Sequence, residues 1–325
     1  MMRSLRSWWA YCAIFVLFAV AAVVTTGVWQ VTAQNLQCRS SGYDNEHFLA
    51  YCDNPTYADY EHGALLYGIE PGVIDNLRGA DVLFVGNSKA QFAFSSKAVE
   101  DYFDSIHVRF FVLGFGYGEE STFALAVLRK WPVSPKLLVI NADPFFSTAI
   151  SSAGSSALEG KPAFFWRLAL KLLFQRVHRG VCFVASHVCP ESKASIFRSA
   201  RNGQWRLSSW HVAEKSVAVD GSGQITMNRE SLRDPARLGE EFLNAVGVSR
   251  NCVILTGVPN SLLDSPGIAA GLASFLKTQS VLPAVGGLAT IDSVHLNPAS
   301  VERWSAQFVQ AMTPILRKCL PSRAF

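Results

Sequence analysis

The chain has 325 residues, of which 50% are hydrophobic and 17% are charged. A soluble domain usually carries about 25% charged residues, so this composition favours a sizeable core and excludes a mostly disordered chain. The formal net charge is +4, and two of the positive charges belong to Arg3 and Arg6. The rest of the chain is nearly neutral, so no nucleic-acid partner is expected.

The amino-terminal segment has the pattern of a membrane anchor. No charged residue occurs between Arg6 and Arg39, and this stretch includes 22 residues, Trp8 to Trp29, dominated by Ala, Val, Phe and Leu. As a helix, these residues would extend roughly 33 Å, enough to cross the hydrocarbon core of a bilayer. Aromatic residues at both ends suit the two headgroup zones.

This pattern predicts a single-pass protein. Residues 1–34 are expected to form a short cytoplasmic tail and a transmembrane anchor, because the arginines before the span keep the amino terminus in the cytoplasm. Residues 35–325 would then be exported. The alternative is a cleaved signal peptide that ends near Ala33.

The exported part begins with a polar and aromatic stretch, residues 35–75, which predicts an irregular lead-in. Short apolar runs typical of buried parallel strands follow at residues 81–85, 107–113, 136–140 and 252–258. Helices are predicted from the Ser95-Ser96 cap to Phe103, from Glu119 to Lys130, and from Pro298 after the Asn297 cap. This alternation predicts an α/β domain with a parallel sheet covered on both faces.

Residues 147–247 interrupt the alternation and are interpreted as an insertion into the α/β domain. They contain a basic amphipathic run at residues 164–179, with Arg167, Lys171, Arg176 and Arg179 and no acidic residue. Such a run can lie on an anionic membrane surface or face a partner. The alternative is an ordinary covering helix whose basic face is solvated.

Cysteine usage favours an oxidising compartment. Cys12 lies in the apolar span, and the other six cysteines are an even number outside it. Their positions along the sequence suggest three pairs, with free buried thiols as the alternative: Cys38–Cys52, Cys182–Cys189 and Cys252–Cys319. No metal is expected, because no C-x2-C or H-x3-H spacing accompanies these cysteines.

The candidate catalytic residues follow the predicted strands. Ser88 follows the first strand, the glycine-rich turn Gly114–Gly118 follows the second, and Asn141 follows the third. Asp292-Ser-Val-His295 stands just before the closing helix. Loops at the carboxyl ends of parallel strands meet in one crevice. A serine, a histidine oriented by an aspartate, and donors for an oxyanion are the groups that acyl transfer needs.

The glycine-rich turn raises a competing interpretation, a dinucleotide site. The spacing is not G-x-G-x-x-G, and no acidic residue follows about 20 residues on, where Leu137 and Leu138 stand. An exported domain would also meet little NAD. No cofactor is therefore expected.

At these residues the chain resembles the SGNH (GDSL-like) hydrolase and acyltransferase superfamily. Gly86-Asn87-Ser88 is similar to the first block of the family, Gly118 and Asn141 to its second and third, and Asp292-x-x-His295 to its last. The resemblance covers about residues 80–316. It implies a flavodoxin-like three-layer fold with Ser88 as nucleophile, His295 as base and Asp292 as the group that orients it. Ser88 N–H, Gly118 N–H and Asn141 would form the oxyanion hole.

Two positions depart from the family pattern. Asn87 stands where the family has aspartate, and Val139-Ile-Asn-Ala142 replaces Gly-x-Asn-Asp. Neither change removes a catalytic group. Taken singly, each residue also has a structural interpretation: a capping serine, a surface histidine, or an asparagine that hydrogen-bonds within the turn to Asp143.

The membrane-anchored layout resembles that of bacterial inner-membrane proteins whose periplasmic domain adds or removes acyl groups on envelope or exported polysaccharides. The resemblance thus implies serine-dependent transfer or removal of an O-acyl group, usually acetyl, with a polysaccharide substrate and, as a further partner, a membrane protein that exports acyl groups. Trp205 and Trp210 are weak candidates for stacking on sugar rings, and the alternative is that they are buried core aromatic residues. The alternative function is a non-catalytic, anchored binding or assembly protein built on an inactive fold of this kind.

Overall fold

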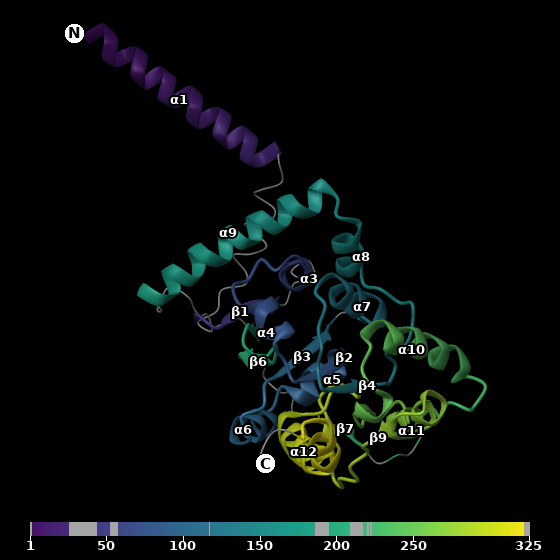
Figure 1. The fold of residues 1–325 in the computed structure, drawn as a ribbon. Coiled ribbons are helices and arrows are strands. Elements are labelled where there is room, and N and C mark those ends of the chain that lie inside the picture. Colours follow the sequence, from purple (N-terminus) through teal and green to yellow (C-terminus); the bar gives the residue numbers. More distant parts are fainter. Residues whose placement is uncertain are drawn as a thin grey trace.

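The computed structural model describes residues 2–25, 44–52, 58–116, 118–185, 195–208, 217–219, 221 and 223–321 (Figure 1). In chain order its elements are α1 (Met2–Thr25), β1 (His47–Cys52), α3 (Ala58–Tyr67), α4 (Val73–Arg78), β2 (Val82–Asn87), α5 (Ser88–Phe94), α6 (Lys97–Ser105), β3 (Phe110–Phe115), α7 (Ser121–Lys130), β4 (Leu137–Asn141), α8 (Ser152–Glu159), α9 (Pro162–Val184), β5 (Ser195–Ser199), β6 (Trp205–Ser208), β7 (Val217–Ala218), α10 (Arg233–Val246), the 3-10 turn η3 (Arg250–Cys252), β8 (Val253–Thr256), α11 (Ser265–Leu276), β9 (Gln279–Ser280), β10 (Ala289–Thr290) and α12 (Pro298–Cys319).

A five-stranded parallel sheet forms the centre of the molecule. Its strand order is β3-β2-β4-β8-β9, and every neighbouring pair is parallel. Numbered along the chain, this order is 2-1-3-4-5, the flavodoxin-like arrangement. The mixed α/β class with a parallel sheet, predicted from the sequence, is confirmed.

Alternate residues of each strand face opposite layers of helices. In β2, Leu83 and Val85 belong to one buried cluster with residues of α3, α7, α10 and α11. Val82 and Phe84 belong to the other, with residues of α5, α6 and α12. Burial on both faces explains why these strands are continuous apolar runs rather than alternating patterns.

The predicted strands and caps agree with the structure to within a few residues. Ser96 caps α6 by accepting a hydrogen bond from Val99 N–H. Asn297 caps α12 by accepting one from Ser300 N–H at 2.9 Å. Both caps satisfy amide groups that a helix start leaves without an intrahelical partner.

The prediction of an irregular lead-in at residues 35–75 was wrong. This segment contains β1, α3 and the start of α4. β1 pairs antiparallel with β5, and β5 with β6, to form a second sheet. The pairing of β1 with β5 joins segments about 150 residues apart, so no local sequence pattern could indicate it.

The stretch interpreted as an insertion, residues 147–247, contributes α8, α9, β5, β6, β7 and α10. α10 differs from the others because Ala236, Phe242 and Leu243 are part of the same buried cluster as α7 and α11. It is therefore a covering helix of the central sheet, whereas β5 and β6 belong to the second sheet.

Among the described residues, no helix combines the length and the apolar character needed to cross a membrane. The single-span anchor at residues 1–34 thus has no support in the structure and stays a prediction.

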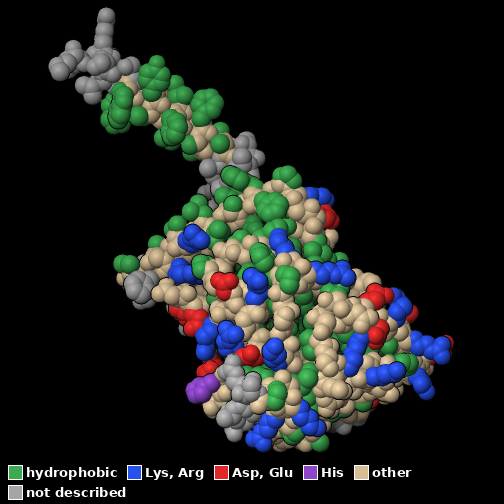
Figure 2. All heavy atoms as spheres, viewed as in Figure 1, with side chains coloured by type: hydrophobic (Ala, Val, Ile, Leu, Met, Phe, Trp, Pro, Cys, Tyr) green, Lys and Arg blue, Asp and Glu red, His purple; other side chains and the backbone are tan. Residues whose placement is uncertain are grey.

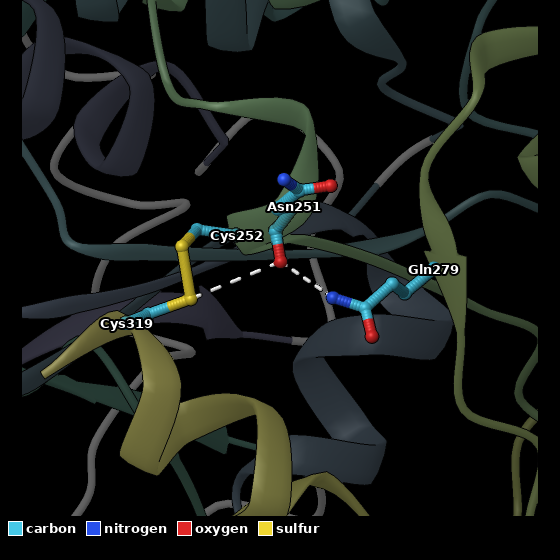
Figure 3. Close-up of a disulfide and its surroundings, with 4 residues drawn as sticks. All are labelled: Asn251, Cys252, Gln279 and Cys319. Atoms are coloured by element: carbon cyan, nitrogen blue, oxygen red, sulfur yellow. Dashed lines mark hydrogen bonds between the residues drawn. A yellow bond between two sulfur atoms is a disulfide. The ribbon is translucent and has the colours of Figure 1, made fainter.

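A disulfide joins Cys252 to Cys319, as the sequence suggested, with their Cα atoms 5.8 Å apart (Figure 3). It ties the turn before β8 to the end of α12, and 67 residues separate the two cysteines. The other two suggested pairs, Cys38–Cys52 and Cys182–Cys189, involve side chains outside the described part of the chain.

Candidate active site

The site lies where the order of the sheet reverses. β2 is the first strand of the sheet along the chain, and its neighbours β3 and β4 lie on opposite sides of it. Ser88 directly follows β2, and Asn141 is the last residue of β4. Ligands of open parallel sheets bind at this point, outside the carboxyl ends of the strands.

A tight turn from β2 into α5 presents Ser88 as the first residue of that helix. Gly86 permits the turn, because a Cβ there would lie 2.5 Å from Ala90 Cβ and 3.2 Å from Asn141 Cβ. Asn87 caps α5: its Oδ1 accepts from Lys89 N–H at 3.0 Å, and its Nδ2 donates to Pro144 O at 3.1 Å. Asn87 therefore has a structural role in the turn.

Asp292 and His295 form a compact turn. Asp292 Oδ1 accepts from the backbone N–H of Val294 at 3.0 Å and of His295 at 2.8 Å, while its Oδ2 lies 2.7 Å from His295 Nδ1. Ser293, inside the turn, has a φ of 70°, a left-handed conformation that is uncommon for a residue with a side chain. The turn thus fixes both the backbone and the ring of His295.

The other ring nitrogen of His295 reaches the serine. His295 Nε2 lies 2.8 Å from Ser88 Oγ, although 207 residues separate the two. With Nδ1–H donated to the carboxylate, Nε2 is left as the acceptor for the serine hydroxyl. The structure therefore brings together the three side chains that the sequence had proposed as nucleophile, base and orienting acid.

Asp292 remains ionised in this arrangement. Partial burial raises its pKa, but the hydrogen bonds from the His295 ring and from the His295 and Val294 backbone outweigh that effect and lower its pKa from 3.8 to about 2. A permanent negative charge at Nδ1 stabilises the imidazolium that would form when His295 accepts a proton.

Phe92, which no sequence motif indicates, packs against the His295 ring. The two ring centroids are 4.5 Å apart. Phe92 lies one helical turn after Ser88 on α5, so one short helix supplies both the serine and the packing for its partner. This i, i+4 spacing was the only signal in the sequence, and it is too common to be diagnostic.

Trp205 contacts Phe92, and its side chain is buried rather than accessible to a ligand. Only 7% of its surface is exposed, its Nε1–H donates to Glu61 Oε1 at 2.8 Å, and its ring makes an edge contact with Phe92. Trp205 also lines a cavity of about 680 Å³, whose wall includes Phe92, Ile291, Leu296 and Val301. A buried ring offers no free face, so sugar stacking at Trp205 gains no support. Trp210 is outside the described residues.

The side chain of Asn141 is turned into the protein. It is fully buried, its Oδ1 accepts from Val258 N–H at 2.9 Å, and its Nδ2 donates to Asp143 O at 3.2 Å. These bonds match the structural interpretation of Asn141. Gly118 has a φ of 70° and open space beside its Cα. The oxyanion roles of Asn141, Gly118 and the Ser88 N–H stay predictions.

A buried charged cluster, which was not predicted from the sequence, stabilises the turn that carries Ser88. Lys89 Nζ lies 2.9 Å from Asp143 Oδ2, and both side chains are almost fully buried. The same carboxylate oxygen accepts from Ser265 Oγ and, at 3.3 Å, from Asn260 Nδ2. The cluster thereby ties the residue after Ser88 to the ends of β4 and β8, and its burial makes each partner costly to remove.

Glu120 is buried near this cluster, and burial raises its pKa from 4.5 to about 7. Between about pH 4.5 and about pH 7, the Glu120 carboxyl group is protonated in the folded chain but ionised in the unfolded chain. The stabilising effect of that protonation is fully present below about pH 4.5 and is lost as the pH rises through about 7.

Glu120→Gln should remove this pH dependence, because the amide is neutral throughout. Urea unfolding of both proteins at about pH 4.5 and above about pH 7 measures the effect. The free energy of unfolding of the variant, relative to that of wild type, should be higher at the upper pH than at the lower. An identical stability difference at the two ends of that range would contradict the assignment.

Among the described residues, no group of three or more His, Cys, Asp or Glu side chains is arranged to hold a metal ion. Comparisons with known proteins do not add to the geometry: no family model, no curated protein and no solved structure matches this chain.

Proposed function

We propose that the protein is a serine esterase or O-acyltransferase whose nucleophile is Ser88. The observation that carries the proposal is the continuous chain of hydrogen bonds from Asp292 through His295 to Ser88, with distances of 2.7 and 2.8 Å. An exposed serine alone is a weak nucleophile, and an adjacent base oriented by a carboxylate is the usual means of activating it.

In the proposed reaction, Ser88 Oγ attacks the carbonyl carbon of an ester while His295 Nε2 takes the hydroxyl proton. Collapse of the tetrahedral intermediate breaks the bond to the leaving alcohol, which receives that proton from His295, and leaves an acyl group on Ser88. An acceptor hydroxyl then loses its proton to His295 and attacks the acyl group. Oγ recovers the proton as the acylated acceptor departs. Water as acceptor gives hydrolysis, and a sugar hydroxyl gives transfer.

The family and setting are part of the same proposal. Ser88 and Asn141 at the ends of neighbouring strands, and an Asp-x-x-His turn before the last helix, occur in the order of the SGNH superfamily, and the strand order suits its fold. With an anchored amino terminus in the bacterial inner membrane, the domain would be periplasmic. Tethering would concentrate the active site where nascent envelope polysaccharide and acyl donors meet.

Labelling with a serine-reactive fluorophosphonate tests the chemistry. We expect covalent modification of wild type, located on Ser88 by peptide mass spectrometry, and none in Ser88→Ala. Ser105→Ala, which removes an exposed serine on α6, is the matched control and should label normally. A folded wild-type chain that never reacts would favour the alternative, a binding or assembly protein.

A further inference from the structure

Helix α9 carries an apolar stripe on its outer face. Trp166, Leu173, Val177, Val181 and Val184 are 45–84% exposed, which is unusual for side chains of this kind. Their spacings of seven, four, four and three residues place them along one side of the helix. Figure 2 shows hydrophobic side chains along this edge of the molecule, over α9.

The opposite face of the same helix is packed against the domain. Phe164 and Leu168 are part of the main buried cluster, and Lys171 and Gln175 are buried beside them. Gln175 exchanges hydrogen bonds with the backbone of Leu49 in β1. The inner face is therefore fully occupied, and the outer stripe cannot be explained as core.

The charges on α9 have one sign. The helix has arginine and lysine but no acidic residue. At about 100° per residue, Arg167 and Arg176 project to opposite sides of the stripe that begins at Trp166. An apolar stripe flanked on both sides by cations suits an anionic lipid surface, because the apolar side chains enter the acyl boundary while the cations reach phosphate groups.

The position of α9 agrees with this charge pattern. α9 lies on the side of the domain that faces α1, the predicted anchor segment (Figure 1). We propose that α9 lies in the plane of the membrane surface, with its stripe immersed in anionic lipid, and so provides a second contact that fixes the orientation of the domain. Arg167 and Arg176, beside the stripe, suit α9 to lie on the bilayer rather than span it. The proposal does not depend on the acyl-transfer chemistry.

Site-specific photo-cross-linking of the full chain tests it. A benzoylphenylalanine replaces Leu173 on the stripe or, as the matched control, Arg237, which is equally exposed on α10. Both variants are reconstituted in vesicles of equal parts phosphatidylcholine and phosphatidylglycerol, and flotation, circular dichroism and thermal unfolding verify insertion and folding. A second stripe position, Val177, guards against a local failure at Leu173.

We expect lipid adducts at positions 173 and 177 to exceed those at position 237 severalfold, and to fall when phosphatidylcholine replaces phosphatidylglycerol. Equal adducts at stripe and control positions would overturn the proposal. So would cross-links from the stripe to protein alone, which would instead indicate a second copy or another partner. A chain that fails to float with the vesicles would overturn it as well.

Discussion

His295→Gln should lower the turnover of a small activated ester by about 10⁴-fold or more, equivalent to about 5.5 kcal/mol or more of lost transition-state stabilisation. The imidazole is the group within 2.8 Å of Ser88 Oγ that can take its proton. Glutamine can occupy part of the same space against Phe92 but cannot accept and return a proton. Steady-state rates, with circular dichroism to verify the fold, measure the effect.

The chain provides a close control in another Asp-x-x-His turn, at Asp44 and His47. His47 Nδ1 lies 2.9 Å from Asp44 Oδ1, and the backbone N–H of His47 donates to the same oxygen. His47→Gln removes an equivalent aspartate–histidine bond and should leave turnover within a few-fold of wild type. Equal losses in the two variants would point to general destabilisation rather than to loss of a base.

Asp292→Asn should reduce turnover by about 10⁴-fold with little change in structure. The asparagine Oδ1 can still accept from the backbone N–H groups of Val294 and His295, so the turn persists. Its amide group, however, would donate to His295 Nδ1. The ring proton would then move to Nε2, where it points at Ser88 and leaves no acceptor for the hydroxyl.

Rates over a range of pH separate this mechanism from simple unfolding. In wild type the Asp292 carboxylate stays charged down to about pH 2, so its protonation does not set the acidic limit of activity. The variant should be slow at every pH and retain the thermal stability of wild type. Near-normal turnover in Asp292→Asn would remove the carboxylate from the mechanism.

Four strands of the central sheet, β2, β3, β4 and β8, were predictable because they are buried on both faces. The fifth, the two-residue β9, is partly exposed and was not predicted. Burial on both sides demands continuous apolar runs, and runs such as residues 136–140 are visible without any knowledge of the fold. Helix caps at Ser96 and Asn297 were equally visible, since capping depends on residues only a few positions apart. Local sequence patterns were therefore enough to predict these strands and caps.

The segment before the sheet was not predictable, because its stability depends on distant partners. α3 buries Glu61 and His62, residues that are typical of exposed segments. Glu61 is paired with Arg198 at 2.7 Å, and His62 with Glu119 at 3.0 Å. Both partners lie far away in the sequence, so the segment has the composition of a solvated loop although it is core.

The candidate site likewise combines features that local residues determine with one that depends on a distant partner. An aspartate three residues before a histidine occurs four times, at Asp44, Asp59, Asp104 and Asp292, and the turns at Asp44 and Asp292 have nearly the same local hydrogen bonds. Local spacing alone could not distinguish them. The contact that distinguishes Asp292-x-x-His295 is the long-range one between His295 and Ser88. In the sequence, it was indicated only by the position of Ser88 after a strand and of His295 before the last helix.

The most direct measurement is the mass of the intact protein after brief exposure to an activated acetyl ester and acid quench. We expect wild type to gain one acetyl group, which peptide analysis locates on Ser88, and Ser88→Ala to gain none at that peptide. Acetylation of other residues alone, or equal acetylation of Ser88→Ala, would contradict a nucleophilic serine at the end of β2.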